Sequence, residues 1–198
     1  MPSIFFQLRL AAARFYYSCG GFGLHQAQMM VSQEMTKKPL SPVRIYTSLT
    51  EMKDHVSRLK WTEDPWGGKL DILKHPTFMQ EALDQHPEFS GDCDDYAGYF
   101  IVAIRKGKLA ESAHFGFALW EDKGDITGHM VCVFLKEGSW WWVSNWYNCQ
   151  PQAIPSVYGW VDAMQEKMGK KVLIAGRILV EGIKPDDTIE IGSLLRCR

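Results

Sequence analysis

The sequence of 198 residues lacks several features that would assign it directly to a functional class. No apolar run approaches the roughly 20 residues that a membrane-spanning helix needs, and there is no internal repeat or low-complexity tract. The 22 Lys and Arg residues are balanced by 23 Asp and Glu residues, and no basic patch is interleaved with aromatic residues. The sequence therefore predicts no transmembrane span, and nucleic acid is not expected as a partner.

Cysteine is scarce and irregularly spaced. The sequence has no C-x-x-C pair, and its five cysteines are Cys19, Cys93, Cys132, Cys149 and Cys197. This spacing argues against a zinc ribbon and against a dense disulfide framework, so neither a metal nor another cofactor is predicted. A reducing, cytoplasmic setting fits best, although a pairing of Cys132 with Cys149 stays open.

What the sequence does contain is enough apolar surface for one globular domain. Hydrophobic residues make up 46% of the chain, and eight of its aromatic residues are Trp. The Pro-bearing stretch "KKPLSP" at 37–42 reads as a linker, so we expect an N-terminal extension over 1–35 and the domain over 36–198.

The expected N-terminal extension has Arg9 and Arg14 but no acid before Glu34, and polar residues interrupt its apolar part. A secretory signal is a poor fit. A basic amphipathic anchor, a helix docked on the domain, and a segment outside the domain proper all stay open. An assembly partner could bind through this segment.

Periodicity predicts helices before strands. Helices are expected over 48–60, where Ser48 and Glu51 form a capping box, and from Asp92 onward. One short helix is expected within 76–89, ending before Pro87. The run "YAGYFIVAI" (96–104) is apolar almost all round, which predicts a buried central helix, and Gly98 within it indicates close approach of another element. Strands over 113–120, 129–136 and 139–146 form a predicted antiparallel meander, followed by a helix over 155–169 and a final strand over 170–182. This order is typical of an α+β domain, with the Cys93 helix packed on an antiparallel sheet.

Cys93 is the first candidate for chemistry. If Asp92 caps a helix that begins at Cys93, the helix dipole and the unpaired backbone N–H groups favour a thiolate. The carboxylates of Asp92, Asp94 and Asp95 act in the opposite direction, because they disfavour a further negative charge. We therefore expect Cys93 to need an imidazole partner.

His129 is the best placed of the six histidines, because it opens a strand directly after Gly128. The predicted strand over 129–136 and the one over 139–146 are joined by a hairpin loop. If that loop is centred on Glu137 or on Gly138, the residue numbers of each pair facing across the two strands add up to an even number. His129 then faces Asn145 directly or diagonally, and the amide can orient the ring. An odd sum would place these two on opposite faces and favour Asn148 instead. The residues thus permit a triad of Cys93, His129 and Asn145. The alternative is a structural thiol, an ordinary strand-end histidine and a surface asparagine.

The motifs "GDCDDYA", "GHMVCVF" and "WWWVSNW" together resemble the transglutaminase-like superfamily of cysteine enzymes, which has a papain-like fold. They are most similar to its small bacterial and phage branch, the transglutaminase-like cysteine peptidases. Upstream, "WTEDPWGGKLDILKHP" is also similar, so the resemblance covers roughly residues 43–150.

The resemblance implies that Cys93 is the nucleophile, His129 the general base and acid, and Asn145 the orienting third member. Many relatives carry Asp at the third position, and "VSN" allows the match to fall on Ser144 or on Asn145. We take Asn145, because Ser144 has the wrong strand parity if Asn145 has the right one.

The expected activity is that of a cysteine-dependent hydrolase or acyltransferase acting on peptide or carboxamide bonds of proteins through a thioester, with proteolysis favoured over cross-linking. Two alternatives stay open. The first is a non-catalytic structural or binding protein that retains the fold, such as a phage virion component, and the second is an amidase acting on peptidoglycan. A cytoplasmic location is expected, or a virion-associated one if the source is a phage.

Overall fold

The computed structural model describes residues 41–62, 73–85 and 91–196, so the predicted N-terminal extension lies outside the described residues. The helices are α3 (Leu49–Val56), α5 (Pro76–Gln85), α6 (Cys93–Lys106) and α7 (Gly159–Met168), with a short 3-10 helix, η1 (Trp146–Cys149). The strands are β1 (Ser112–Asp122), β2 (Asp125–Lys136), β3 (Ser139–Val143), β4 (Gln152–Ile154), β5 (Val172–Ile183) and β6 (Ile189–Arg196). Within the described ranges, no helix combines the length and apolar character that a membrane crossing requires.

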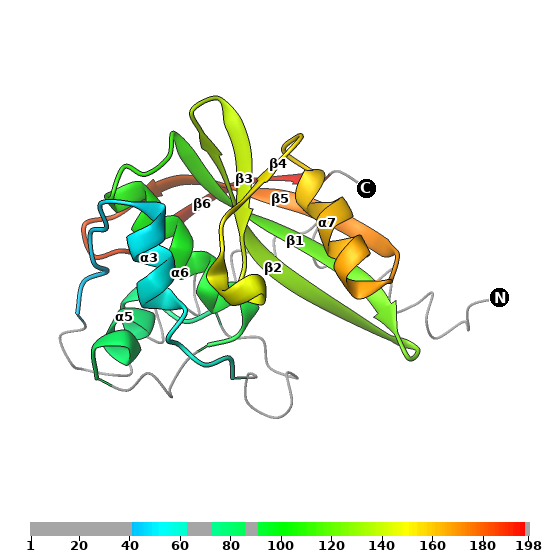
Figure 1. Ribbon diagram of the computed structural model, residues 1–198, viewed down its shortest axis with the longest axis horizontal. Helices are drawn as coiled ribbons and strands as arrows, with labels where there is room; N and C mark the ends of the chain where they lie inside the picture. The colour runs from blue at the N-terminus through cyan, green and yellow to red at the C-terminus, as the bar shows by residue number, and fades with distance from the viewer. Residues whose placement is uncertain (1–40, 63–72, 86–90, 197–198) are drawn as a thin grey trace.

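All six strands form one antiparallel sheet in the order β4-β3-β2-β1-β5-β6 (Figure 1). The successive antiparallel pairing of β1, β2 and β3 confirms the predicted meander. Strand β4 pairs with β3, and β5 pairs with the other side of β1. The α+β class is confirmed.

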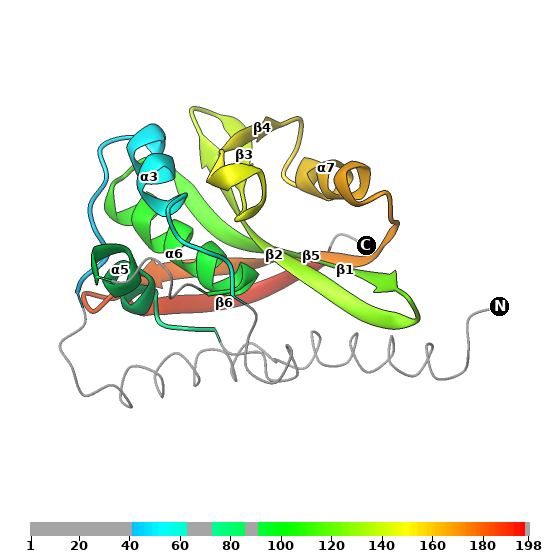
Figure 2. The same ribbon diagram turned by 60° about the horizontal axis from the view of Figure 1, so that its bottom comes forward.

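Side chains that alternate along each strand divide the core into two clusters. On β2, Cys132 and Phe134 pack into a large cluster with α6, whereas Val131 and Val133 pack into a smaller, Trp-rich cluster with α7. Both views show α3, α5 and α6 grouped together and α7 apart from them (Figures 1 and 2). We call the two sides of the sheet the α6 side and the α7 side.

The predicted central helix is present, and its residues from Asp94 to Ile104 are buried. At Gly98, an added Cβ would lie 3.5 Å from the side chains of Leu73 and Ile189, at ordinary contact distance. Another element therefore packs directly against the helix at this glycine, as the sequence predicted.

Two strands were not predicted, and one was predicted too long. The segment expected as a strand over 139–146 leaves the sheet after Val143, and β4 follows the turn there. The predicted final strand is β5, and a tight turn with an Asp187 N–H to Lys184 carbonyl bond sends the chain back as β6. Pro185 and Asp186, residue types that favour turns, explain the reversal.

Candidate active site

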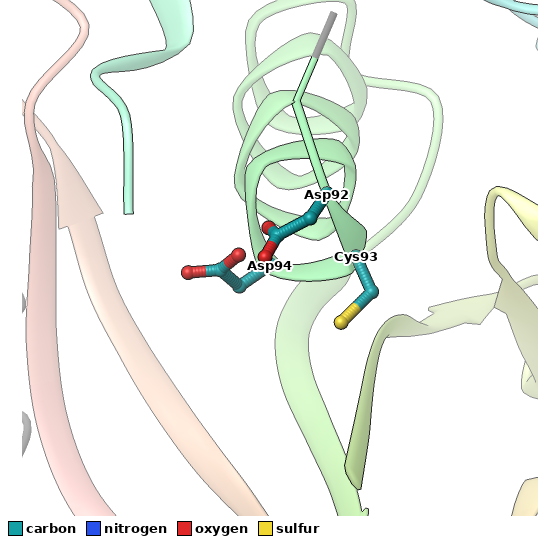
Figure 3. Close-up of side chains that lie close together, drawn as sticks. All are labelled: Asp92, Cys93 and Asp94. Atoms are coloured by element: carbon teal, nitrogen blue, oxygen red, sulfur yellow. The ribbon is translucent and has the colours of Figure 1, made fainter. Parts of the chain in front are cut away.

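Cys93 is the first residue of α6, and its thiol is partly buried. Asp92, in an extended conformation, is the N-cap residue, and its backbone N–H donates to the Asp95 carboxylate at 3.2 Å. The predicted helix start is therefore confirmed. Figure 3 shows the side chains of Cys93 and Asp94 leaving this end of the helix on different sides.

Asp95 has a structural partner rather than a catalytic one. Its buried carboxylate accepts the Lys74 backbone N–H and forms an ion pair with the Lys74 ammonium at 2.6 Å. Burial raises the pKa of the Asp95 carboxyl, and the Lys74 cation opposes this effect. The pair fixes the start of α6, and thus Cys93, to the segment that precedes α5.

The donor atoms of Asp92, Cys93 and Asp94 lie within 4.8 Å of one another, close enough to be considered as metal ligands (Figure 3). Acidic groups also gather at helix N-termini because they interact favourably with the helix dipole. The cluster alone therefore does not define a metal site.

His129 lies on β2 and is only 7% exposed. Its Nε2 is 2.7 Å from the Ser144 Oγ, and its ring stacks on Trp146 with centroids 3.9 Å apart and an interplanar angle of 10°. Burial, with a smaller effect of the Lys167 cation, lowers the pKa of His129 to about 3. The imidazole is therefore neutral at physiological pH.

The β2–β3 register differs from the one that was expected. Lys136 pairs with Ser139 and Cys132 with Val143, so the sums are odd and the loop consists of two residues, Glu137 and Gly138. Both loop residues have positive φ, 52° and 72°, as the favoured two-residue hairpin turn requires. The even register predicted from a loop centred on one residue is wrong.

The odd register changes which residue meets the imidazole. The Ser144 hydroxyl contacts the ring. The Asn145 side chain bonds to Ser144 instead, because its Oδ1 accepts from the Ser144 hydroxyl at 3.2 Å. Asn148, the alternative for this register, is exposed. The parity argument that favoured Asn145 over Ser144 therefore fails. Asn145 belongs to the site, but it reaches His129 only through Ser144.

The chain after Asn145 crosses from the α7 side to the α6 side, where Cys149 packs into the large cluster. Tyr147, Asn148 and Cys149 have φ values of 57°, 52° and 57°, in the left-handed region that non-glycine residues rarely enter. The Lys167 ammonium of α7 lies 3.7 Å from the Tyr147 ring centroid and 5.1 Å from that of Trp146. This turn was not predicted, because Asn148 is the only one of the three residues that favours a left-handed backbone.

Cys93 and His129 belong to elements that pack on the two sides of the sheet. Strand alternation places His129 on the α7 side, with Val131 and Val133, whereas Cys93 begins the helix of the α6 side. The described contacts of the His129 ring come from Ser144 and Trp146, and the Lys167 cation acts on it electrostatically. A pairing of Cys93 with His129 stays a prediction.

Among the cysteines that the structure describes, Cys93 is the least buried. Cys132 and Cys149 are free thiols, so the open question of their pairing is answered in the negative. Burial raises the pKa of both, to about 12 for Cys149, and leaves them poor nucleophiles. Cys93 is thus the best candidate for a reactive thiol in the described part of the chain.

A scan against protein-family models and searches of curated proteins and of solved structures gave no match. The assignment of a function to this site therefore rests on its chemistry and on the motif resemblance.

Proposed function

We propose that the protein is a cysteine-dependent hydrolase or acyltransferase that acts on peptide or carboxamide bonds of proteins, with a papain-like, transglutaminase-like core. The observation that carries the proposal is the position of Cys93, whose partly buried thiol stands at the first residue of a 14-residue helix. Backbone N–H groups and the dipole at this position stabilise negative charge on sulfur and on a reacting carbonyl oxygen.

In the proposed reaction, the thiol proton passes to His129 and the sulfur attacks the substrate carbonyl carbon. The tetrahedral intermediate collapses to a thioester as the C–N bond breaks, and the imidazolium gives its proton to the leaving amine. Water then hydrolyses the thioester to a carboxylic acid, or a primary amine takes the acyl group. Either step restores the Cys93 thiol. We expect hydrolysis to predominate.

The neutral state of His129 supports its role as a base, because only the neutral imidazole can accept a proton. The proposal requires the Cys93 sulfur to reach this ring in the reacting complex.

A second candidate is a non-catalytic binding or structural protein that retains the core. The observation that favours it is the environment of His129, because burial and the Lys167 cation both disfavour the imidazolium that catalysis needs. Ser144 next to the ring adds no compensating negative charge.

The two candidates differ in the reactivity of Cys93 toward iodoacetamide, followed from pH 5 to 9 by peptide-resolved mass spectrometry. The enzyme requires alkylation of Cys93 below pH 7 to be at least tenfold faster than that of a free thiol, and His129→Gln to abolish this advantage. His114→Gln is the matched control, since burial also lowers the pKa of His114, to about 4. Reactivity of Cys93 equal to that of a free thiol, or unchanged in His129→Gln, would refute the enzyme.

A further inference from the structure

We infer that Ser144 is the positioning residue that fixes the tautomer of His129, and that Asn145 acts on the ring only through Ser144. A catalytic consequence of this arrangement rests on the proposed function. The arrangement itself rests on hydrogen bonds alone.

Ser144 is 4% exposed, and its hydroxyl has three partners. It lies 2.7 Å from His129 Nε2, donates to Asn145 Oδ1 at 3.2 Å and accepts from the Trp146 backbone N–H at 3.1 Å. Since these contacts come from the ring itself and from the two residues that follow Ser144, the hydroxyl is the centre of the network.

A hydroxyl has one hydrogen and two lone pairs, so these three contacts determine one another. The hydrogen is used for Asn145, and the Trp146 N–H occupies one lone pair. The remaining lone pair must accept a hydrogen from His129 Nε2. The imidazole therefore carries its proton on Nε2 and its free lone pair on Nδ1, and Nδ1 is the atom that can accept the thiol proton.

This arrangement orients the ring without adding charge. A carboxylate in the place of Ser144 would also stabilise the imidazolium, whereas a neutral hydroxyl cannot, and this agrees with the lowered pKa of His129. Asn145 has a distinct role, because it holds the Ser144 hydrogen away from the ring. Without the amide, that hydrogen can rotate toward Nε2 and move the ring proton to Nδ1.

The test is the tautomer of His129, read from long-range ¹H–¹⁵N correlation spectra of protein labelled in its histidine rings and assigned by the signals lost in His129→Gln. The Nε2–H form is expected in the wild type. It is expected to persist in Ser144→Thr, which keeps the hydroxyl, and to give way to a mixture in Ser144→Ala. In Asn145→Ala the Nδ1–H form should predominate. A wild-type Nδ1–H form, or a tautomer unchanged in both alanine variants, would overturn the inference.

A second measurement covers the case in which the alanine variants unfold. Ser144→Asp should raise the titration midpoint of His129 by about one to three pH units, because a carboxylate at hydrogen-bond distance favours the imidazolium. An unchanged midpoint would show that position 144 does not face the ring. Both readouts are independent of Cys93, so a confirmed tautomer with an unreactive thiol would refute only the proposed function. A reactive Cys93 thiol together with a tautomer other than the expected one would refute only the role of Ser144.

Discussion

The two sides of the sheet stabilise their buried polar groups in different ways. On the α6 side, a buried carboxylate keeps a cation as its partner, as Asp95 does with Lys74. On the α7 side, His129 lies among tryptophans and has neutral hydrogen-bond partners, and the nearest cation disfavours its charged form. The charge of Asp95 is therefore compensated by a cation, whereas the charged form of His129 is suppressed.

A second buried polar group on the α6 side is a hydrogen-bonded network around Tyr46. The Tyr46 hydroxyl lies 2.6 Å from His55 Nδ1 and 2.7 Å from the Tyr99 hydroxyl, which donates to Gln80. Burial raises the pKa of Tyr46 to about 12, so its hydroxyl keeps its proton at physiological pH. The comparison indicates that α6 has a rigid support, while the environment of His129 can be changed by single substitutions of nearby groups.

The largest effect is expected from breaking the charge pair on the α6 side. Lys74→Met leaves the Asp95 carboxylate buried without its cation and should lower the free energy of unfolding by about 3 kcal/mol at pH 8. Because burial raises the pKa of Asp95, the carboxyl becomes neutral as the pH falls, and the loss should shrink at pH 5.

Urea unfolding at the two pH values measures this effect. Lys170→Met, which removes a half-exposed pair with Asp122, is the matched control and should cost less than about 1 kcal/mol. Equal losses of unfolding free energy in the two variants would contradict the view that Lys74 compensates the buried charge of Asp95.

The α7 side should show the opposite dependence on pH. His129 is neutral in the folded protein down to about pH 3, whereas in the unfolded chain it binds a proton below about pH 6.5. The stability that it contributes is therefore present above pH 6.5 and is lost as the pH falls toward 3, at up to about 1.4 kcal/mol per pH unit.

Unfolding curves of the wild type and of His129→Gln at pH 6.5, 5.5 and 4.5 provide the measurement. The difference in their free energies of unfolding should change by about 2–3 kcal/mol over this range, in favour of the variant at low pH. Parallel pH profiles would show that the imidazole is accessible to protons in the folded protein.

The smallest effect concerns Lys167. Lys167→Met removes the cation above Tyr147 and Trp146 and should cost about 0.5–1 kcal/mol, the usual value at an exposed site. The same change should raise the pKa of His129, because the cation disfavours the imidazolium. Lys171→Met, at an exposed position near the start of β5, is the control. A His129 titration that does not move in Lys167→Met would show that burial alone sets its pKa.

The fold was largely predictable because its local signals agree with its packing. Asp92 before a long apolar run marked the start of α6, and aromatic and β-branched runs between glycine turns marked the strands from β1 to β3. The strand β6 was missed, because its pattern follows a turn that was not recognised.

The site was less predictable, for a geometric reason. A hairpin loop of two residues rather than one or three reverses the parity of every residue on the returning strand. Glu137 adopts a positive φ that glutamate rarely adopts, so the loop length could not be read from residue type. The exchange of Asn145 for Ser144 beside the imidazole follows from that single difference.

The turn of Tyr147, Asn148 and Cys149 has a stereochemical consequence. Three successive L-residues there have positive φ values. Such values are those of the left-handed α-helix, which D-amino acids favour. A D-amino acid at position 148, whose side chain is exposed, would therefore fit the turn with less strain than the natural residue. In this short segment beside Trp146, the protein has a backbone whose preferred chirality is the reverse of its own.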